Sequence, residues 1–172
     1  MSVYLISDTH FGHKNIITYC NRPFSSVDEM NETLIKNWNS VVKKDDTVYH
    51  LGDFAFGSKE FTQIIVKKLN GHIRLILGNH DMRPIQFYYD CGFHRVYDRP
   101  IIINEYFILT HRPIEPMDEK GIYANFYGHV HDDPRFREAT ARSFNVSSDN
   151  IGFTPILFED AVAKMEQKEN GT

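Results

Sequence analysis

Short apolar runs that alternate with helical segments are the feature that most constrains the fold of this chain. The apolar runs are typical of short buried strands, and the segments between them carry apolar side chains at helical spacing. Strands are predicted at residues 3–7, 47–51 and 72–77, and helices at 26–43 and 58–69. Residues 26–29 fit a capping box, which supports the start of the first of these helices. This half of the chain predicts an α/β fold.

The second half is richer in strands. Strands are predicted at residues 93–98, 100–106, 106–111, 124–129 and 142–147, with helices at 82–91 and 159–168. Hairpin-like connections are expected at 98–100 and 104–105, and a polar stretch at 112–121 interrupts the strands. We therefore expect a single domain over residues 1–172, in which two stacked sheets have helices outside. A single mixed sheet is the alternative.

Composition excludes several classes of protein. The 172 residues carry a net charge of −4, which gives no general attraction to nucleic acid or to an anionic membrane. Cys20 and Cys91 lie far apart, which argues against a disulfide framework and a thiolate zinc site. No signal peptide and no run of about 18 apolar residues is found, so we expect a cytoplasmic protein without a membrane partner.

Polar residues of the types that bind metals follow each of five predicted strands. They are Asp8 and His10, Asp53, Asn79 with His80 and Asp81, His111, and His129 with His131. Each alone has a plainer explanation as a turn or cap residue. In open α/β sheets, however, ligands bind at this edge, so the repetition favours a site. Strand alternation is expected to send His129 and His131 the same way.

The types of these side chains indicate which metal ions they suit and which reaction the ions would support. Carboxylates, imidazoles and one amide without a thiolate suit Mn²⁺, Fe or Zn²⁺ better than a closed structural zinc site. Four histidines, two aspartates and one asparagine would fill two neighbouring coordination spheres if one carboxylate bridged the ions. Two metals about 4 Å apart activate a water and clamp the oxygens of an in-line displacement, which indicates phosphoryl chemistry.

These blocks, in this order, resemble those of the calcineurin-like metallophosphoesterases. The blocks are Asp8-Thr9-His10, Gly52-Asp53, Gly78-Asn79-His80-Asp81, His111 and Gly128-His129-Val130-His131. The stretch at residues 12–24 and the short chain are similar to the small bacterial and phage members. The resemblance implies a four-layer α/β/β/α sandwich of two mixed sheets flanked by helices, metallophosphoesterase type, with a dinuclear site at the strand ends.

The resemblance also implies a role for each block. One metal would take Asp8, His10 and His131, the other Asn79, His111 and His129, and Asp53 would bridge them. The implied catalytic residue is His80, which would bind the phosphate and protonate or stabilise the leaving oxygen. A metal-bridging hydroxide would be the nucleophile. Mn²⁺ is the preferred ion, with Fe, Zn²⁺ and Ni²⁺ as alternatives.

Some residues leave alternatives open. Asp81 either orients His80 or anchors the turn, and His13, Lys14 and Arg112 either contact phosphate or belong to solvated loops. Histidines away from the ligand edge are interpreted as structural; these are His50, His72 and His94. Residues 54–57 replace the Asp-Arg-Gly of the protein-phosphatase branch, which argues against that activity.

The function predicted is a metal-dependent phosphoesterase that hydrolyses a phosphodiester or phosphomonoester. A small phosphate ester is the expected substrate, a nucleotide being one candidate. The aromatic cluster at residues 87–89 would either stack a base or pack in the core. The alternative is a catalytically silent scaffold, as in a retromer subunit that resembles this fold. A nuclease has no support, because the chain lacks a basic surplus. The oligomeric state stays open.

Overall fold

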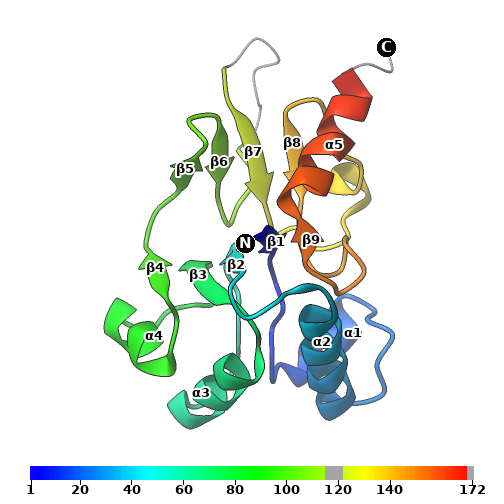
Figure 1. Cartoon of the computed structure of the whole chain (residues 1–172). Coiled ribbons are helices and arrows are strands. Elements are labelled where there is room, and N and C mark those ends of the chain that lie inside the picture. The colour runs from blue at the N-terminus through cyan, green and yellow to red at the C-terminus, as the bar shows by residue number, and fades with distance from the viewer. Residues whose placement is uncertain (115–121, 170–172) are drawn as a thin grey trace.

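The computed structural model describes residues 1–114 and 122–169 (Figure 1). The helices are α1 (Lys14–Tyr19), α2 (Val27–Val41), α3 (Lys59–Lys68), α4 (Ile85–Cys91), the 3₁₀ turn η1 (Pro134–Phe136) and α5 (Phe158–Glu169). The strands are β1 (Val3–Ile6), β2 (Thr47–His50), β3 (His72–Ile76), β4 (Arg95–Tyr97), β5 (Ile101–Ile103), β6 (Phe107–Leu109), β7 (Ala124–Tyr127), β8 (Ser143–Asn145) and β9 (Ile156–Leu157).

The strands form two mixed sheets. The first sheet has the order β4-β3-β2-β1-β9, in which β1 to β4 are parallel and β9 is antiparallel to β1. The second has the order β5-β6-β7-β8, in which only β5 runs against its neighbour. Helical segments between β1, β2, β3 and β4 provide the crossovers that parallel strands require.

Two apolar cores hold these layers together. α2, α3 and α4 lie on one face of the first sheet (Figure 1). The core there contains side chains such as Leu34, Trp38 and Ile65. On the other face, Leu5 belongs to a core shared with Phe126 of the second sheet and with α5. The predicted α/β architecture of two mixed sheets flanked by helices is therefore confirmed.

Serine side chains begin the two longest helices between β1 and β3. Ser26 Oγ accepts from the Glu29 backbone N–H at 3.1 Å, and Ser58 Oγ accepts from that of Phe61 at 3.2 Å. The Glu29 carboxylate accepts from the backbone N–H of Ser25 at 2.7 Å. The return bond of the predicted capping box therefore reaches one residue further back than expected.

The connection at 98–100 is not a hairpin, contrary to expectation. β4 pairs with β3 in the first sheet, whereas β5 belongs to the second, so these three residues cross between sheets. The hairpin at Asn104 and Glu105 is confirmed, and both residues have the left-handed φ, 50° and 58°, that suits a tight turn. α1 and β9 were not predicted, because both are short. Residues 115–121 of the polar stretch lie outside the described residues.

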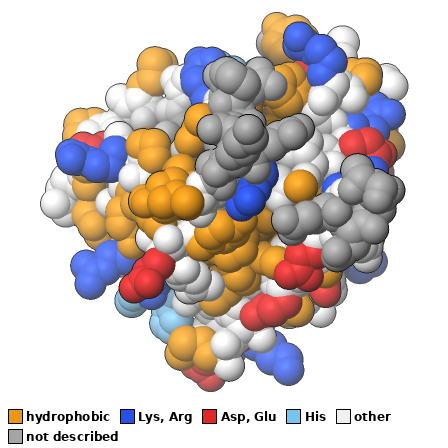
Figure 2. Space-filling model, turned by 90° about the horizontal axis from the view of Figure 1, so that it is seen from above, with side chains coloured by type: hydrophobic (Ala, Val, Ile, Leu, Met, Phe, Trp, Pro, Cys, Tyr) orange, Lys and Arg blue, Asp and Glu red, His pale blue; other side chains and the backbone are white. Residues whose placement is uncertain are grey.

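Hydrophobic side chains gather on the face of the molecule seen in Figure 2. Exposed large hydrophobic residues include Ile102 of β5 and Ile122 ahead of β7. In residues 1–114 and 122–169, no helix has both the length and the apolar character needed to cross a membrane.

We expect Leu34→Ala to lower the free energy of unfolding by about 2–5 kcal/mol, because it opens a cavity under α2 where Leu34 is only 2 % exposed. Urea titration followed by the fluorescence of Trp38, the single tryptophan, measures the change. Ile64→Ala is the control, since Ile64 on α3 is 52 % exposed and should shift the value by less than about 0.5 kcal/mol. Equal effects of the two variants would contradict the assigned core.

Candidate metal centre

The predicted site residues gather where parallel strands of both sheets end. Asp8 follows β1, Asp53 follows β2 and Asn79 follows β3, all in the first sheet. His111 follows β6 and His129 follows β7 in the second sheet. Carboxyl ends of parallel strands share an edge, so residues as far apart in the chain as Asp8 and His131 meet there.

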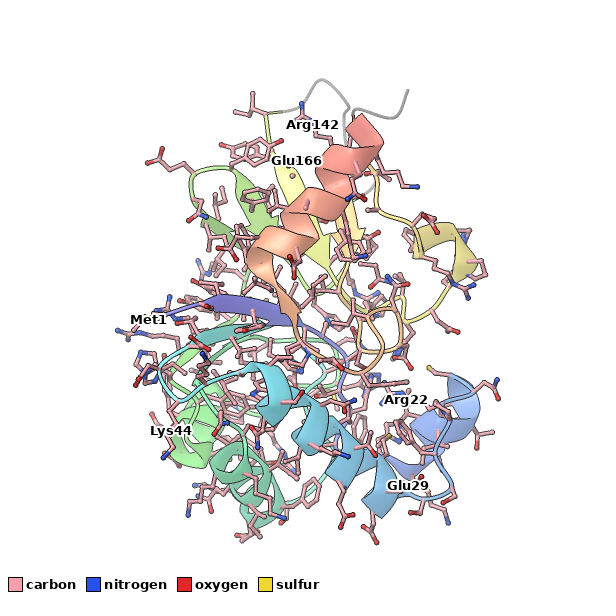
Figure 3. All side chains as sticks on the ribbon, turned by 45° about the vertical axis from the view of Figure 1, so that its right-hand side comes forward. Met1, Arg22, Glu29, Lys44, Arg142 and Glu166 are labelled. Atoms are coloured by element: carbon pink, nitrogen blue, oxygen red, sulfur yellow. The ribbon has the colours of Figure 1, made fainter. Side chains whose placement is uncertain are left out.

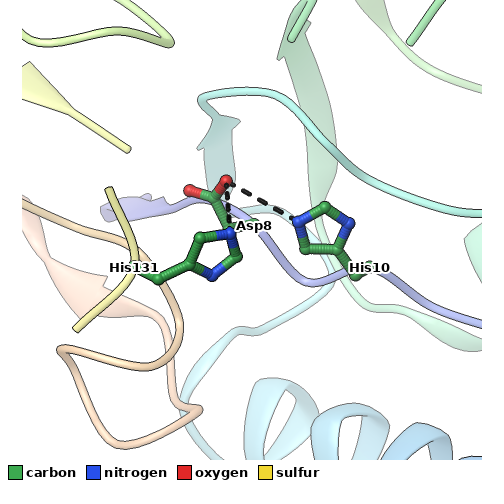
Figure 4. Close-up of side chains that lie close together, drawn as sticks. All are labelled: Asp8, His10 and His131. Carbon is green, nitrogen blue, oxygen red and sulfur yellow. Dashed lines mark ion pairs between the residues drawn. The ribbon is translucent and has the colours of Figure 1, made fainter. Parts of the chain in front are cut away.

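One donor group consists of Asp8, His10 and His131 (Figure 4). Asp8 Oδ1 lies 3.8 Å from His10 Nε2 and 3.9 Å from His131 Nε2, too far for hydrogen bonds. Donors that each lie about 2.1 Å from one ion are separated by roughly 3–4 Å. The spacing of these three side chains therefore suits a shared cation.

The second donor group consists of Asp53, His111 and His129. Asp53 Oδ2 lies 3.5 Å from His111 Nε2, and Asn79 Oδ1 lies 2.9 Å from the same nitrogen. Asn79 is thus beside this group, as predicted. Arg112 donates from Nη1 to His129 Nε2 at 2.6 Å, so a cation bound at that nitrogen requires the guanidinium to move.

Asp53 belongs to the second group and also lies beside the first. Its Oδ2 is 3.7 Å from His10 Nε2 in the first group and 3.5 Å from His111 Nε2 in the second. Burial alone would raise the pKa of this carboxyl, but His111, the backbone N–H of His80 and His10 hold it below its usual range. Asp53 is therefore an ionised carboxylate beside donor nitrogens of both groups.

Unpartnered buried atoms show that these residues fit a metal. Asp8 Oδ1 and both ring nitrogens of His10 are buried and make no hydrogen bond within the described part of the chain. Such atoms destabilise a fold unless something binds them. Burial also lowers the pKa of His10 to about 2, which keeps its ring in the neutral form that binds metals. The donors are nitrogen and oxygen, which suits Mn²⁺, Fe and Zn²⁺.

Five of the seven predicted ligands have a left-handed backbone. The φ values are 56° at Asp8, 50° at His10, 57° at Asp53, 71° at His129 and 50° at His131. This conformation is uncommon outside glycine, and it clusters at functional sites. β7 has ended at Tyr127, so strand alternation does not aim His129 and His131, and the reason predicted for their common direction was wrong. Each instead joins a different donor group.

Two glycines let the loops approach closely. A Cβ on Gly78 would lie 2.2 Å from Asp53 Oδ1, and one on Gly128 would lie 2.3 Å from Asp8 Oδ2. Any larger residue would displace a carboxylate of the site. The blocks Gly78-Asn79 and Gly128-His129 therefore need glycine for space.

His80 lies at the open side of the centre and belongs to neither donor group. Its side chain is 46 % exposed, and its Nε2 lies 4.0 Å from Asp53 Oδ2. Its ring centroid is 5.7 Å from that of His10. This imidazole can reach a molecule that approaches the donor groups from solvent.

Asp81 anchors the turn. Its carboxylate accepts from the backbone N–H groups of Asp53 at 2.6 Å, Gly78 at 2.9 Å and Phe54 at 3.2 Å. Of the two readings left open by the sequence, these bonds favour the anchor, because they tie the loop after β2 to the loop after β3.

Some of the remaining polar residues lie beside the centre and others lie away from it. His50 is buried and contacts Thr9 Oγ1 at 2.9 Å, which matches its structural interpretation. His72 and His94 lie together at the other end of the first sheet, with ring centroids 4.9 Å apart. His13 is beside the centre, its ring centroid 5.7 Å from that of His10, whereas Lys14 is exposed.

Arg22 and Asp149 are the residues that the sequence analysis missed. Arg22, labelled in Figure 3, follows α1, and its guanidinium binds both oxygens of Asp149 at 2.8 Å with no exposure to solvent. Asp149 Oδ2 in turn accepts from His131 Nδ1 at 2.8 Å, which turns Nε2 toward Asp8. Asp149 follows β8 at the same sheet edge, a signal that could have revealed it; Arg22 carries no such signal.

We expect Mn²⁺ to raise the thermal midpoint of unfolding by roughly 5–10 °C at about a hundred times its Kd, because it binds the folded donor groups. Calorimetric scans with the ion and after chelation measure the shift. Asp8→Asn should reduce it, while Asp45→Asn, an exposed carboxylate remote from the centre, should leave it unchanged. Identical midpoints with and without Mn²⁺ would contradict metal binding.

Asp149→Asn should weaken Mn²⁺ binding by about 10–100-fold, because His131 loses the carboxylate that orients it. Isothermal titration calorimetry on protein shown to be folded by circular dichroism measures the affinity. Asp90→Asn is the matched control, since that carboxylate is exposed and pairs with Lys59 on the surface. Wild-type affinity in Asp149→Asn would show that the contact does not orient the ligand.

Comparisons with known proteins agree with this geometry. Residues 1–148 match the calcineurin-like phosphoesterase superfamily domain. An uncharacterized protein, MJ1445, of Methanocaldococcus jannaschii is 40 % identical over 178 residues, 96 % of this chain and 92 % of that protein. The Gene 66 protein of Mycobacterium phage L5 is 44 % identical over 84 residues, 46 % of this chain and 40 % of the phage protein.

A solved structure is also similar. The crystal structure of AQ665, a protein of unknown function from Aquifex aeolicus, superposes with a TM-score of 0.70 at 26 % identity, over 92 % of this chain and 96 % of that one. The match of the superfamily domain over residues 1–148 identifies the family. This chain belongs to the calcineurin-like phosphoesterase superfamily.

Proposed function

We propose that this chain is a metal-dependent phosphoric ester hydrolase that acts on a phosphodiester or phosphomonoester. The observation that carries the proposal is the position of Asp53, with one oxygen within 3.7 Å of a donor nitrogen in each group. A carboxylate shared in this way suits a pair of divalent ions. Membership of the phosphoesterase superfamily supports the same reaction class.

Each donor group would hold one ion. Asp8, His10 and His131 would hold the first, Asn79, His111 and His129 would hold the second, and Asp53 would contact both. Bound divalent ions, with Mn²⁺ as the one that the family resemblance favours, would supply an activated water and positive charge for in-line displacement at phosphorus. Because Asn79 is neutral, the centre keeps enough positive charge to admit an anionic ester.

The residues outside the donor groups have roles toward the substrate. His80 is half-exposed at the mouth of the centre, where its imidazole would bind a phosphate oxygen and give a proton to the leaving oxygen. Arg112 contacts His129 Nε2 and lies 3.5 Å from Asn79 Oδ1. Once displaced from these atoms, its guanidinium is near enough to bind the phosphate and stabilise its developing charge.

We expect Mn²⁺-loaded protein to hydrolyse bis-p-nitrophenyl phosphate or p-nitrophenyl phosphate. His80→Ala should lower kcat by roughly 10²–10⁴-fold and leave Mn²⁺ affinity unchanged, because His80 belongs to neither donor group. Asp53→Asn should lower both kcat and the affinity for Mn²⁺, because it removes the shared carboxylate. p-Nitrophenolate release and titration calorimetry measure the two effects.

His72→Ala is the matched control, an exposed histidine far from the centre that should retain full activity. The absence of turnover with Mn²⁺, Fe²⁺, Zn²⁺ and Ni²⁺ would overturn the proposal. That outcome would support the scaffold that the sequence left as an alternative.

A further inference from the structure

A pocket of about 460 Å³ adjoins the candidate metal centre, and none of its described lining residues belongs to a donor group. His80 and Phe56 are among the residues that line it, which we call the aromatic pocket. The Phe56 ring centroid lies 5.2 Å from that of His80 and 5.9 Å from that of His10. Phe56 and His80 thus line the pocket and also lie beside His10 of the first donor group.

Aromatic rings dominate this pocket. Phe54 and Tyr88 are buried beneath it, with exposed fractions of 1 % and 4 %. Phe56 and Phe87 are only partly buried, and the Phe56 ring also packs against His13, with 4.1 Å between the ring centroids. Aliphatic side chains are scarce among the lining residues, so a flat unsaturated group suits the pocket better than an alkyl chain.

The charged side chains at the pocket would favour a ligand that carries a phosphate. Arg83 lies at the pocket with its guanidinium carbon 5.8 Å from the Phe87 ring centroid, and none of the described lining residues is acidic. A planar guanidinium both stacks on rings and donates to carbonyl or ring nitrogen acceptors. Binding sites for small molecules typically have apolar walls and a few polar groups, and the polar groups fix the orientation of the ligand.

We propose that the aromatic pocket binds the nucleobase of a nucleotide ester whose phosphate lies at the metal centre. The inference rests on the proposed function, since His80 would be near the ester oxygen that links phosphate to nucleoside. Stacking on a base depends on a ring face and tolerates any base, so the pocket selects nucleotides as a class. One sugar separates phosphate from base, which matches a base pocket that begins at His80.

A larger hollow of about 820 Å³ is a poorer candidate. It is lined by residues of β9 and α5, such as Ile156 and Lys164, and contains none of the predicted site residues. A ligand there would lie away from His80 and from both donor groups, so the smaller aromatic pocket carries the substrate inference.

AMP and ribose 5-phosphate test the inference. Both contain ribose and a 5′-phosphate, and only AMP carries a base. We expect AMP to inhibit hydrolysis of bis-p-nitrophenyl phosphate with a Ki roughly tenfold lower than that of ribose 5-phosphate. Phe87→Leu keeps the apolar volume and removes the ring, so it should bring the two values together. Tyr89→Leu is the matched control, an aromatic neighbour on α4 that does not line the pocket.

Equal Ki values in the wild type would overturn the inference, as would a preference for AMP that survives Phe87→Leu. If Phe87→Leu does not fold, Phe56→Leu removes another ring that lines the pocket and tests the same expectation. Calorimetric titration of both ligands into the Mn²⁺-loaded protein reads their affinities even if no ester is hydrolysed. Failure of the proposed function and failure of the base pocket are therefore separate results.

Discussion

One buried guanidinium holds the loops on which the metal centre depends. Arg22 donates to the backbone carbonyls of Asp8 at 2.7 Å and Thr9 at 3.0 Å, and to both oxygens of Asp149. These bonds fix the loop after β1 in a conformation that is unfavourable for its residues, since a left-handed backbone costs about 1–2 kcal/mol at each of Asp8 and His10. A charge buried this deeply is stable only when it is fully paired, so the guanidinium and the loop constrain one another.

The centre also joins the two sheets. The first donor group takes Asp8 and His10 from the first sheet and His131 from the second. The second group takes Asp53 from the first sheet, and His111 with His129 from the second. Neither sheet alone supplies a complete group. The geometry of the site therefore depends on how the sheets stack, which the apolar core around Leu5, Leu109 and Phe126 determines.

Much of this arrangement could be predicted from the sequence, because it follows from local patterns. Apolar runs predicted most of the strands. Ligands bind beyond the carboxyl ends of strands, and this rule predicted that residues such as Asp53 and His111 lie close together. The crossing at 98–100 could not be predicted, since the choice of sheet for β4 depends on pairing with β3 rather than on its own residues. Arg22 could not be predicted either, because its partners lie up to 127 residues away. The sequence pattern predicts where a residue such as His80 lies. The catalytic role expected of it comes from the family resemblance.

The pairing of β9 with β1 has a consequence for the order of folding. Leu157 lies opposite Tyr4, and Ser7 donates through its backbone N–H to Val146 O at 2.9 Å, so the loop carrying Asp8 is enclosed by the last third of the chain. Contacts between such distant segments form late, because closing a long loop has an entropic cost that local pairs avoid. During synthesis from the amino terminus, β1 therefore gains its edge partner, and the loop carrying Asp8 is enclosed, only after residues 146–157 have emerged.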